Sequence, residues 1–105
     1  MVGERREVPY VAEFLWDYTR EGNVEHIARH KVTPGDVHEV RDNQPHFYDA
    51  RPGYEGVVML GPNQAGRFLY LAMLEVEPLG VWQVITAYWL QRRRALRLYL
   101  REAEE

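Results

Sequence analysis

The sequence lacks cysteine altogether and has a single lysine, Lys31, beside twelve arginines. Without cysteine, neither a disulfide framework nor a thiolate metal site is possible. The same absence fits a reducing cytoplasm, which is the predicted location. No apolar run approaches the ~18 residues of a membrane span. The first residues contain no apolar signal region, so we expect neither export nor a membrane partner.

Charge is unevenly divided along the 105 residues, a length that predicts one domain spanning 1–105. The net charge of −3 argues against a globally basic nucleic-acid binder. Residues 1–50 hold six basic and ten acidic side chains, a net −4, whereas residues 51–101 hold seven and three, a net +4. Because phosphate affinity depends on local positive charge, any nucleic-acid surface is expected in the second half. A GC-rich or heat-adapted source explains the excess of arginine equally well.

Two helices are expected in the first half of the chain. Asn23 is a good cap for the first of them. Lys31 follows that helix, and a left-handed helix end favours glycine, so this lysine is expected to carry strain. Thr33 can cap the second helix, Pro34 suits its first position, and Asp36 completes a capping-box-like pair. The elements expected before residue 45 are a charged lead-in at 1–11, a strand at 12–16 and helices at 23–30 and 34–42.

The second half changes from helical periodicity to short apolar strands joined by tight turns, which predicts an antiparallel meander. A helical pattern returns at the end, where Leu96, Tyr99, Leu100 and Ala103 can share one face. The fold class predicted is α+β: an antiparallel sheet of four to five strands, two N-terminal helices and a C-terminal helix, with the helices covering one face. The expected strands lie at 46–49, 57–60, 67–76 and 81–88, and the last helix at about 89–103.

Three stretches carry motifs in a definite order: Trp16 to Val40, Gly61 to Arg67 and Trp82 to Tyr88. The first contains Trp-Asp, two histidines four residues apart and Val-Thr-Pro; the second is Gly-Pro-Asn-Gln-Ala-Gly-Arg; the third is Trp-Gln-Val-Ile-Thr-Ala-Tyr. In order and spacing, over roughly Glu13 to Tyr99, the chain resembles the BrnT family of bacterial toxins, small ribonucleases with the RelE-like fold. The resemblance implies the toxin component of a BrnT/BrnA-like toxin–antitoxin module, which cleaves RNA without a metal or other cofactor. It also implies a ribbon-helix-helix antitoxin as partner beside RNA, and leaves self-association open.

The resemblance implies that arginines carry the chemistry, and two positions depart from it. Pro62 stands where an arginine is common, and Tyr88 stands where an arginine is usual. Arg67 keeps the Gly-Arg step, where it would clamp a phosphate and stabilise the charge that develops as the 2′-hydroxyl attacks. Tyr88 can donate a hydrogen bond or a proton but brings no positive charge. We therefore predict Arg67 and Tyr88 as catalytic residues, with weakened cleavage that depends on Arg67. Phosphate contacts are predicted for Arg51, Lys31, Arg93 and Arg97.

Each candidate also has a purely structural interpretation. Arg67 can pair with Asp49 or Glu75, and the arginines of the last helix can form a solvated face. Tyr99 is expected to pack rather than to stack on a base. Together with the acidic net charge and the two departures, these interpretations favour an alternative function. The alternative is a non-catalytic relative on the same scaffold that binds RNA or a protein.

His26 and His30 are four residues apart on one helix, a spacing that lets two imidazoles share a metal ion. A small metal-binding module is therefore a third reading. The sequence offers no obvious third ligand, so we predict no metal site and expect both rings to bond backbone groups or Asp17. His38 and His46 lie outside the resemblance. Either can act as a general base, because the pKa of an unperturbed imidazole is near neutrality.

Overall fold

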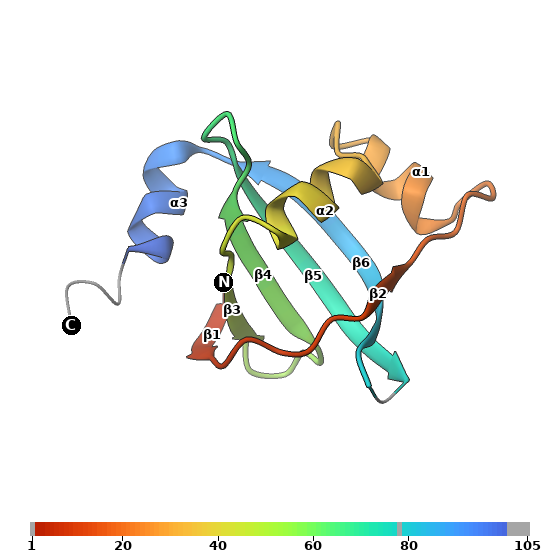
Figure 1. Cartoon of the computed structure of the whole chain (residues 1–105), viewed down its shortest axis with the longest axis horizontal. Coiled ribbons are helices and arrows are strands. Elements are labelled where there is room, and N and C mark those ends of the chain that lie inside the picture. The colour runs from red at the N-terminus through yellow and green to blue at the C-terminus, as the bar shows by residue number, and fades with distance from the viewer. Residues whose placement is uncertain (1, 78, 101–105) are drawn as a thin grey trace.

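The structure, a computed structural model, describes residues 2–77 and 79–100 as one mixed sheet with three helices. The strand order is β1-β3-β4-β5-β6-β2, and every neighbouring pair is antiparallel except β2 and β6. Helices α1 and α2 lie across one face of the sheet, and α3 lies at its end (Figure 1). The strands are β1 (Val2–Arg6), β2 (Glu13–Leu15), β3 (His46–Ala50), β4 (Val57–Pro62), β5 (Phe68–Glu77) and β6 (Val81–Leu90), and the helices are α1 (Asn23–Ala28), α2 (Pro34–Arg41) and α3 (Arg92–Tyr99).

The α+β class is confirmed, but the sheet differs from the prediction in two respects. It has six strands rather than four or five, and it is mixed rather than antiparallel. The sixth strand is β1, which lies within the supposed lead-in at 1–11 and pairs with β3. A strand at a sheet edge takes its stability from its partner, and this partner lies some forty residues away in sequence, so local composition did not reveal it. The chain then crosses to the far edge, where β2 runs parallel to β6 (Figure 1).

The first helix begins differently from the prediction. Gly22 is the residue before α1, and Asn23 is the first helical residue rather than the cap. The Asn23 side chain accepts a hydrogen bond from the Asp17 amide (2.8 Å) and donates to the carbonyls of Leu15 (2.9 Å) and Val84 (3.1 Å). Asn23 therefore ties α1 to both β2 and β6. Asp17 also serves this helix start, because its carbonyl accepts from the Val24 amide.

The predicted features between α1 and α2 are confirmed. Lys31 has a φ of 63°, the left-handed conformation expected at this helix end. At the start of α2, the Thr33 hydroxyl accepts from the Asp36 amide (3.1 Å) and the Asp36 carboxylate accepts from the Thr33 amide (2.9 Å). This reciprocal capping box fixes where α2 begins, and so fixes the short segment that carries Lys31.

The core lies between the sheet and the pair α1 and α2. Ile27, Val37 and Val40 are fully buried there against Leu69 and Leu71, also fully buried. Because side chains alternate along a strand, the residues that follow Leu69 and Leu71 in β5 point to the other face of the sheet. Among residues 2–77 and 79–100, no helix is long and apolar enough to cross a membrane.

A second, smaller cluster lies on the opposite face and is covered by α3. Tyr48, Leu60 and Tyr70 form it, and Leu98 and Tyr99 of α3 pack against it. The prediction that all helices cover one face is therefore wrong. The predicted inner face of the last helix is also shifted, since Ala95 is its buried residue and Leu100 is exposed, while Ala103 lies outside the described residues. Since α3 has only eight residues, it covers one end of this face and leaves the rest uncovered.

Candidate functional site

A cavity of about 390 Å³ opens on the face of the sheet that α1 and α2 do not cover. Tyr70 of β5 and Tyr88 and Thr86 of β6 line it, together with Arg51 and Tyr54 from the loop between β3 and β4. Open, largely apolar concavities with a few polar groups are the usual places for ligands. The cavity is therefore our candidate functional site.

Tyr70 and Tyr88 are paired across β5 and β6, and their rings are stacked. The ring centroids are 4.8 Å apart and the planes differ by 21°. Burial, followed by the neighbouring Tyr88, raises the pKa of the Tyr70 phenol, while Arg51 and Arg94 act in the opposite direction. At neutral pH the Tyr70 hydroxyl is therefore protonated and able to donate. Tyr70 is buried behind the partly exposed Tyr88, so the Tyr88 ring offers the aromatic surface on which a planar ligand can stack.

Two histidines of the first helical segment stand at the β6 side of the cavity. His26 Nε2 lies 3.3 Å from the Thr86 hydroxyl, and the His30 ring centroid lies 6.0 Å from that of Tyr88. The expectation that these histidines bond backbone groups or Asp17 differs from what the structure shows for the His26 ring. Its partner is Thr86, and the Asp17 carboxylate instead accepts from the amide and hydroxyl of Thr19, which lowers the pKa of Asp17. Within residues 2–77 and 79–100, no group of three or more His, Cys, Asp or Glu side chains could hold a metal ion.

Arg51 stands on the loop side of the cavity. Its guanidinium carbon lies 4.2 Å from the centre of the Tyr54 ring, and Nη2 donates to the Tyr54 hydroxyl (2.6 Å). Tyr54 therefore restricts the position of the guanidinium beside the Tyr70–Tyr88 pair. Of the six predicted site residues, Arg51 and Tyr88 are the two that line the cavity.

Arg67 lies on the other face of the sheet. Its guanidinium carbon is 4.4 Å from the centre of the Trp89 ring, and Trp89 packs against the core cluster under α1 and α2. The Trp89 indole donates to the Lys31 carbonyl (3.1 Å), so Arg67 and Lys31 both contact the Trp89 side chain. The structural partners considered for Arg67 lie elsewhere: Asp49 pairs with Arg6, and Glu75 is at the far end of β5. The structure thus separates the two predicted catalytic residues, Arg67 and Tyr88.

The remaining candidates of the last helix do not line the cavity. Arg93 and Arg97 are exposed on α3, as their structural interpretation requires. The prediction that Tyr99 packs is confirmed, since its ring stacks on His46 at 3.8 Å and its hydroxyl donates to the Gln44 carbonyl (2.7 Å). His46 is therefore held beneath Tyr99 and is not placed to act as a base in the cavity.

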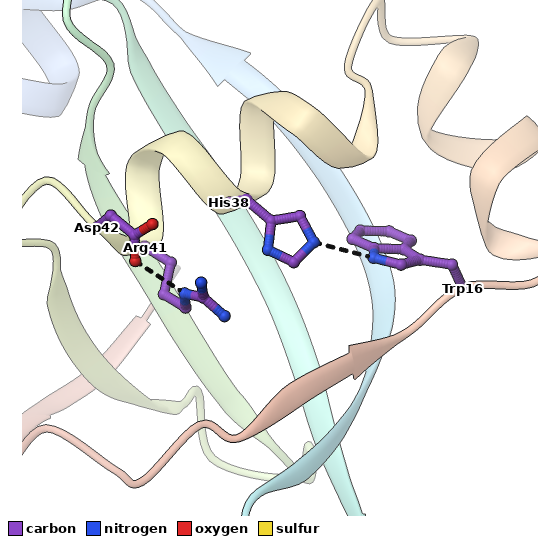
Figure 2. Close-up of polar contacts among 4 residues, drawn as sticks. All are labelled: Trp16, His38, Arg41 and Asp42. Atoms are coloured by element: carbon purple, nitrogen blue, oxygen red, sulfur yellow. Dashed lines mark hydrogen bonds and ion pairs between the residues drawn. The ribbon is translucent and has the colours of Figure 1, made fainter.

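His38 lies on the helix-covered side of the sheet, in a cluster with Trp16 (Figure 2). The Trp16 indole donates to His38 Nε2 (3.3 Å), and the neighbouring Phe14 ring meets the imidazole edge-on. Burial lowers the pKa of His38, nearby Arg41 lowers it further, and Asp42 opposes them. A neutral ring is what the indole N–H requires as its acceptor. His38 therefore links β2 to α2 and is remote from the cavity.

Sequence-based prediction selected Arg51 and Tyr88 of the cavity but missed its other polar side chains, which are Tyr54, Glu55, Tyr70 and Thr86. Tyr70 gives no local signal, because its position opposite Tyr88 depends on the register of β5 and β6. Comparison of the chain with protein-family models, with curated proteins and with solved structures found no match.

Proposed function

We propose that this protein binds single-stranded RNA on the uncovered face of its sheet. The observation that carries the proposal is the stacked pair Tyr70 and Tyr88 on the cavity wall, with Arg51 beside it. Unpaired bases stack on such aromatic surfaces, and each contact is worth ~1–3 kcal/mol. Arg51 supplies a cation for the neighbouring phosphate. Paired bases are already stacked within a duplex, so the tyrosines favour an unpaired strand.

The same cavity supports slow cleavage of that strand without a metal ion. A base removes the 2′-hydroxyl proton, the oxygen attacks the adjacent phosphorus, and the 5′-oxygen leaves with a proton from an acid. A 2′,3′-cyclic phosphate and a 5′-hydroxyl result. His30 and Tyr88 are neighbours and offer an imidazole to accept a proton and a phenol to donate one. Among the described residues that line the cavity, Arg51 alone is positively charged, and Glu55 is negatively charged, so weak stabilisation of the phosphate supports a low rate.

The motifs of the sequence extend this proposal to a biological role. We propose a BrnT-like ribonuclease toxin that acts in the cytoplasm and is held inactive by a ribbon-helix-helix antitoxin. Tyr54 and Ile85 give a partner an apolar contact beside the cavity, because they are 63% and 48% exposed. The second candidate is a non-catalytic RNA- or protein-binding relative, which the same shortage of cavity cations favours.

Fluorescence anisotropy with a labelled, unstructured oligoribonucleotide tests the binding proposal. Tyr88→Ala is expected to weaken affinity roughly tenfold or more, because one stacking contact is lost. Tyr88→Phe keeps the ring and should keep the affinity, while slowing any cleavage measured in the presence of EDTA. Tyr18→Ala is the matched control, because Tyr18 is 74% exposed and does not line the cavity. Equal affinity for the parent and Tyr88→Ala would contradict the proposal.

A further inference from the structure

Side chains from the two faces of the sheet lie close together at the outer edge of β6. Tyr88 and Trp89 are consecutive residues and point to opposite faces. Among the described strands, β2 covers this edge only from Val81 to Gln83, so no strand pairs with the following part of β6. The segment after α1 lies there instead: His30 contacts Tyr88, and the Lys31 carbonyl accepts from Trp89. One short segment thus borders the cavity on one face and Trp89 on the other.

Around Trp89, positively charged residues come from three parts of the chain. Lys31 follows α1 and its backbone carbonyl accepts from the Trp89 indole, while Arg67 precedes β5 and its guanidinium lies over the Trp89 ring. Arg92 begins α3 and donates to the Gly66 carbonyl (3.0 Å), next to Arg67 in the sequence. Glu39 is an acidic residue nearby, and its carboxylate already accepts from the Gln64 amide (2.7 Å). Lys31, Arg67 and Arg92 together outweigh the charge of Glu39, although the chain as a whole is acidic.

Arg67 is well positioned before any ligand arrives. The Asn63 side chain accepts from the Arg67 amide (2.9 Å), and the Asn63 amide donates to the Arg67 carbonyl (2.8 Å). The guanidinium then rests on the Trp89 ring. A guanidinium held over an aromatic ring keeps its N–H groups available for two hydrogen bonds to a phosphate. This contact reduces the side-chain entropy that Arg67 loses on binding.

We propose that Arg67 and Lys31 form a second, phosphate-binding subsite for the same RNA strand, reached from the cavity across the edge of β6. This inference rests on the proposed RNA binding at Tyr70 and Tyr88. Its ligand is a phosphodiester of a strand long enough to pass from one face to the other. A very short oligonucleotide fills the cavity alone, whereas a longer one contacts both subsites. In this arrangement Arg67 increases the affinity for the RNA strand and does not take part in cleavage of the phosphodiester bond.

The test compares RNA of two lengths on the same variants. Affinities of oligouridylates of roughly three and roughly twelve nucleotides, lengths that bracket the smaller single-strand sites, are measured at several salt concentrations. Arg67→Ala is expected to leave the short RNA unaffected and to weaken the long one roughly fivefold to tenfold. Loss of one phosphate contact should also reduce the steepness of log affinity against log salt by ~0.7 for the long RNA alone. Arg6→Ala is the control, because it removes the same charge at β1.

The outcomes separate this inference from the proposed function. Long RNA bound equally by the parent and by Arg67→Ala overturns the second subsite and leaves RNA binding at the cavity intact. Equal losses for short and long RNA also overturn it, because Arg67 would then belong to the same subsite as Tyr88. A parent that binds neither RNA overturns both, and self-association or capture of a protein by the uncovered face would then be the remaining role. Length-dependent loss at Arg67, with no change for Arg6→Ala, is the supporting result.

Discussion

Tyr88 and Trp89 follow one another on β6 and present their rings to opposite faces of the sheet. Tyr88 stacks on Tyr70 at 4.8 Å in the cavity, while Trp89 carries the Arg67 guanidinium at 4.4 Å on the helix-covered side. A strand's side chains alternate, so a single step in sequence moves a residue from one candidate surface to the other. Arg67 and Tyr88 therefore cannot act on one atom without a change in fold, and their roles are predicted to differ.

Introducing an arginine into the cavity is expected to speed cleavage. The Ile85→Arg variant adds a second guanidinium to the lining that holds Arg51, leaves the Tyr70–Tyr88 pair intact, and should raise the cleavage rate ~10-fold or more by charge stabilisation at the phosphate. Product formation from labelled RNA measures the rate, and growth inhibition without a partner measures toxicity. The control is Arg93→Ala, an exposed arginine of α3 outside the cavity. An Ile85→Arg protein that folds and cleaves no faster would place the reaction elsewhere.

Replacing Lys31 by glycine should have opposite effects on stability and on RNA binding. The lysine holds a φ of 63°, which glycine adopts without penalty, so Lys31→Gly is expected to stabilise the fold by up to ~1 kcal/mol. The same change removes a cation of the second subsite and should weaken binding of the longer RNA. Denaturant titration and anisotropy measure the two quantities. Lys31→Ala is the matched variant, expected to lose affinity without gaining stability.

The capping box of α2 is expected to contribute measurably to stability. Thr33→Ala removes the hydroxyl that accepts from the Asp36 amide and should cost ~1 kcal/mol in the free energy of unfolding. Asp36→Ala should cost a similar amount, because its carboxylate accepts from the Thr33 amide. The double variant should cost less than the two single costs added together, since both residues serve one motif. Strict additivity in chemical denaturation would show that the two bonds act independently.

The contact between Trp16 and His38 predicts lower stability in mild acid. The pKa of His38 is lowered from 6.5 in the folded protein, so the unfolded chain takes up a proton more readily. Neutral His38 therefore contributes fully to the free energy of unfolding above pH 6.5. This contribution is lost as the pH falls below that value toward the pKa of His38 in the folded protein. His38→Gln should flatten this part of the profile of melting temperature against pH, and Trp16→Phe should reduce its slope. An unchanged profile in both variants would rule out His38 as its source.

Local signals in the sequence were sufficient for several elements. The Thr33-Pro34-Gly35-Asp36 run predicted the start of α2, because a capping box involves only residues three apart. Lys31 was expected in a left-handed conformation for an equally local reason, the end of a helix. The strands after Pro45 were predictable from their apolar composition and from the turn residues between them. In the candidate site, the resemblance to the BrnT family selected Tyr88, and the search for phosphate-binding cations selected Arg51; both line the cavity.

What the sequence by itself determined is therefore the class of the fold, most of its elements and the residue types available for binding. Which of these elements and residues contact one another was decided only by the tertiary structure. Strand β1 was missed because its stabilising partner, β3, is distant in the chain. Tyr70 was missed, and Arg67 was grouped with Tyr88, because strand register and the direction of each side chain depend on pairings that no local pattern specifies. Packing of α3 on the second face then set where the cavity could remain open.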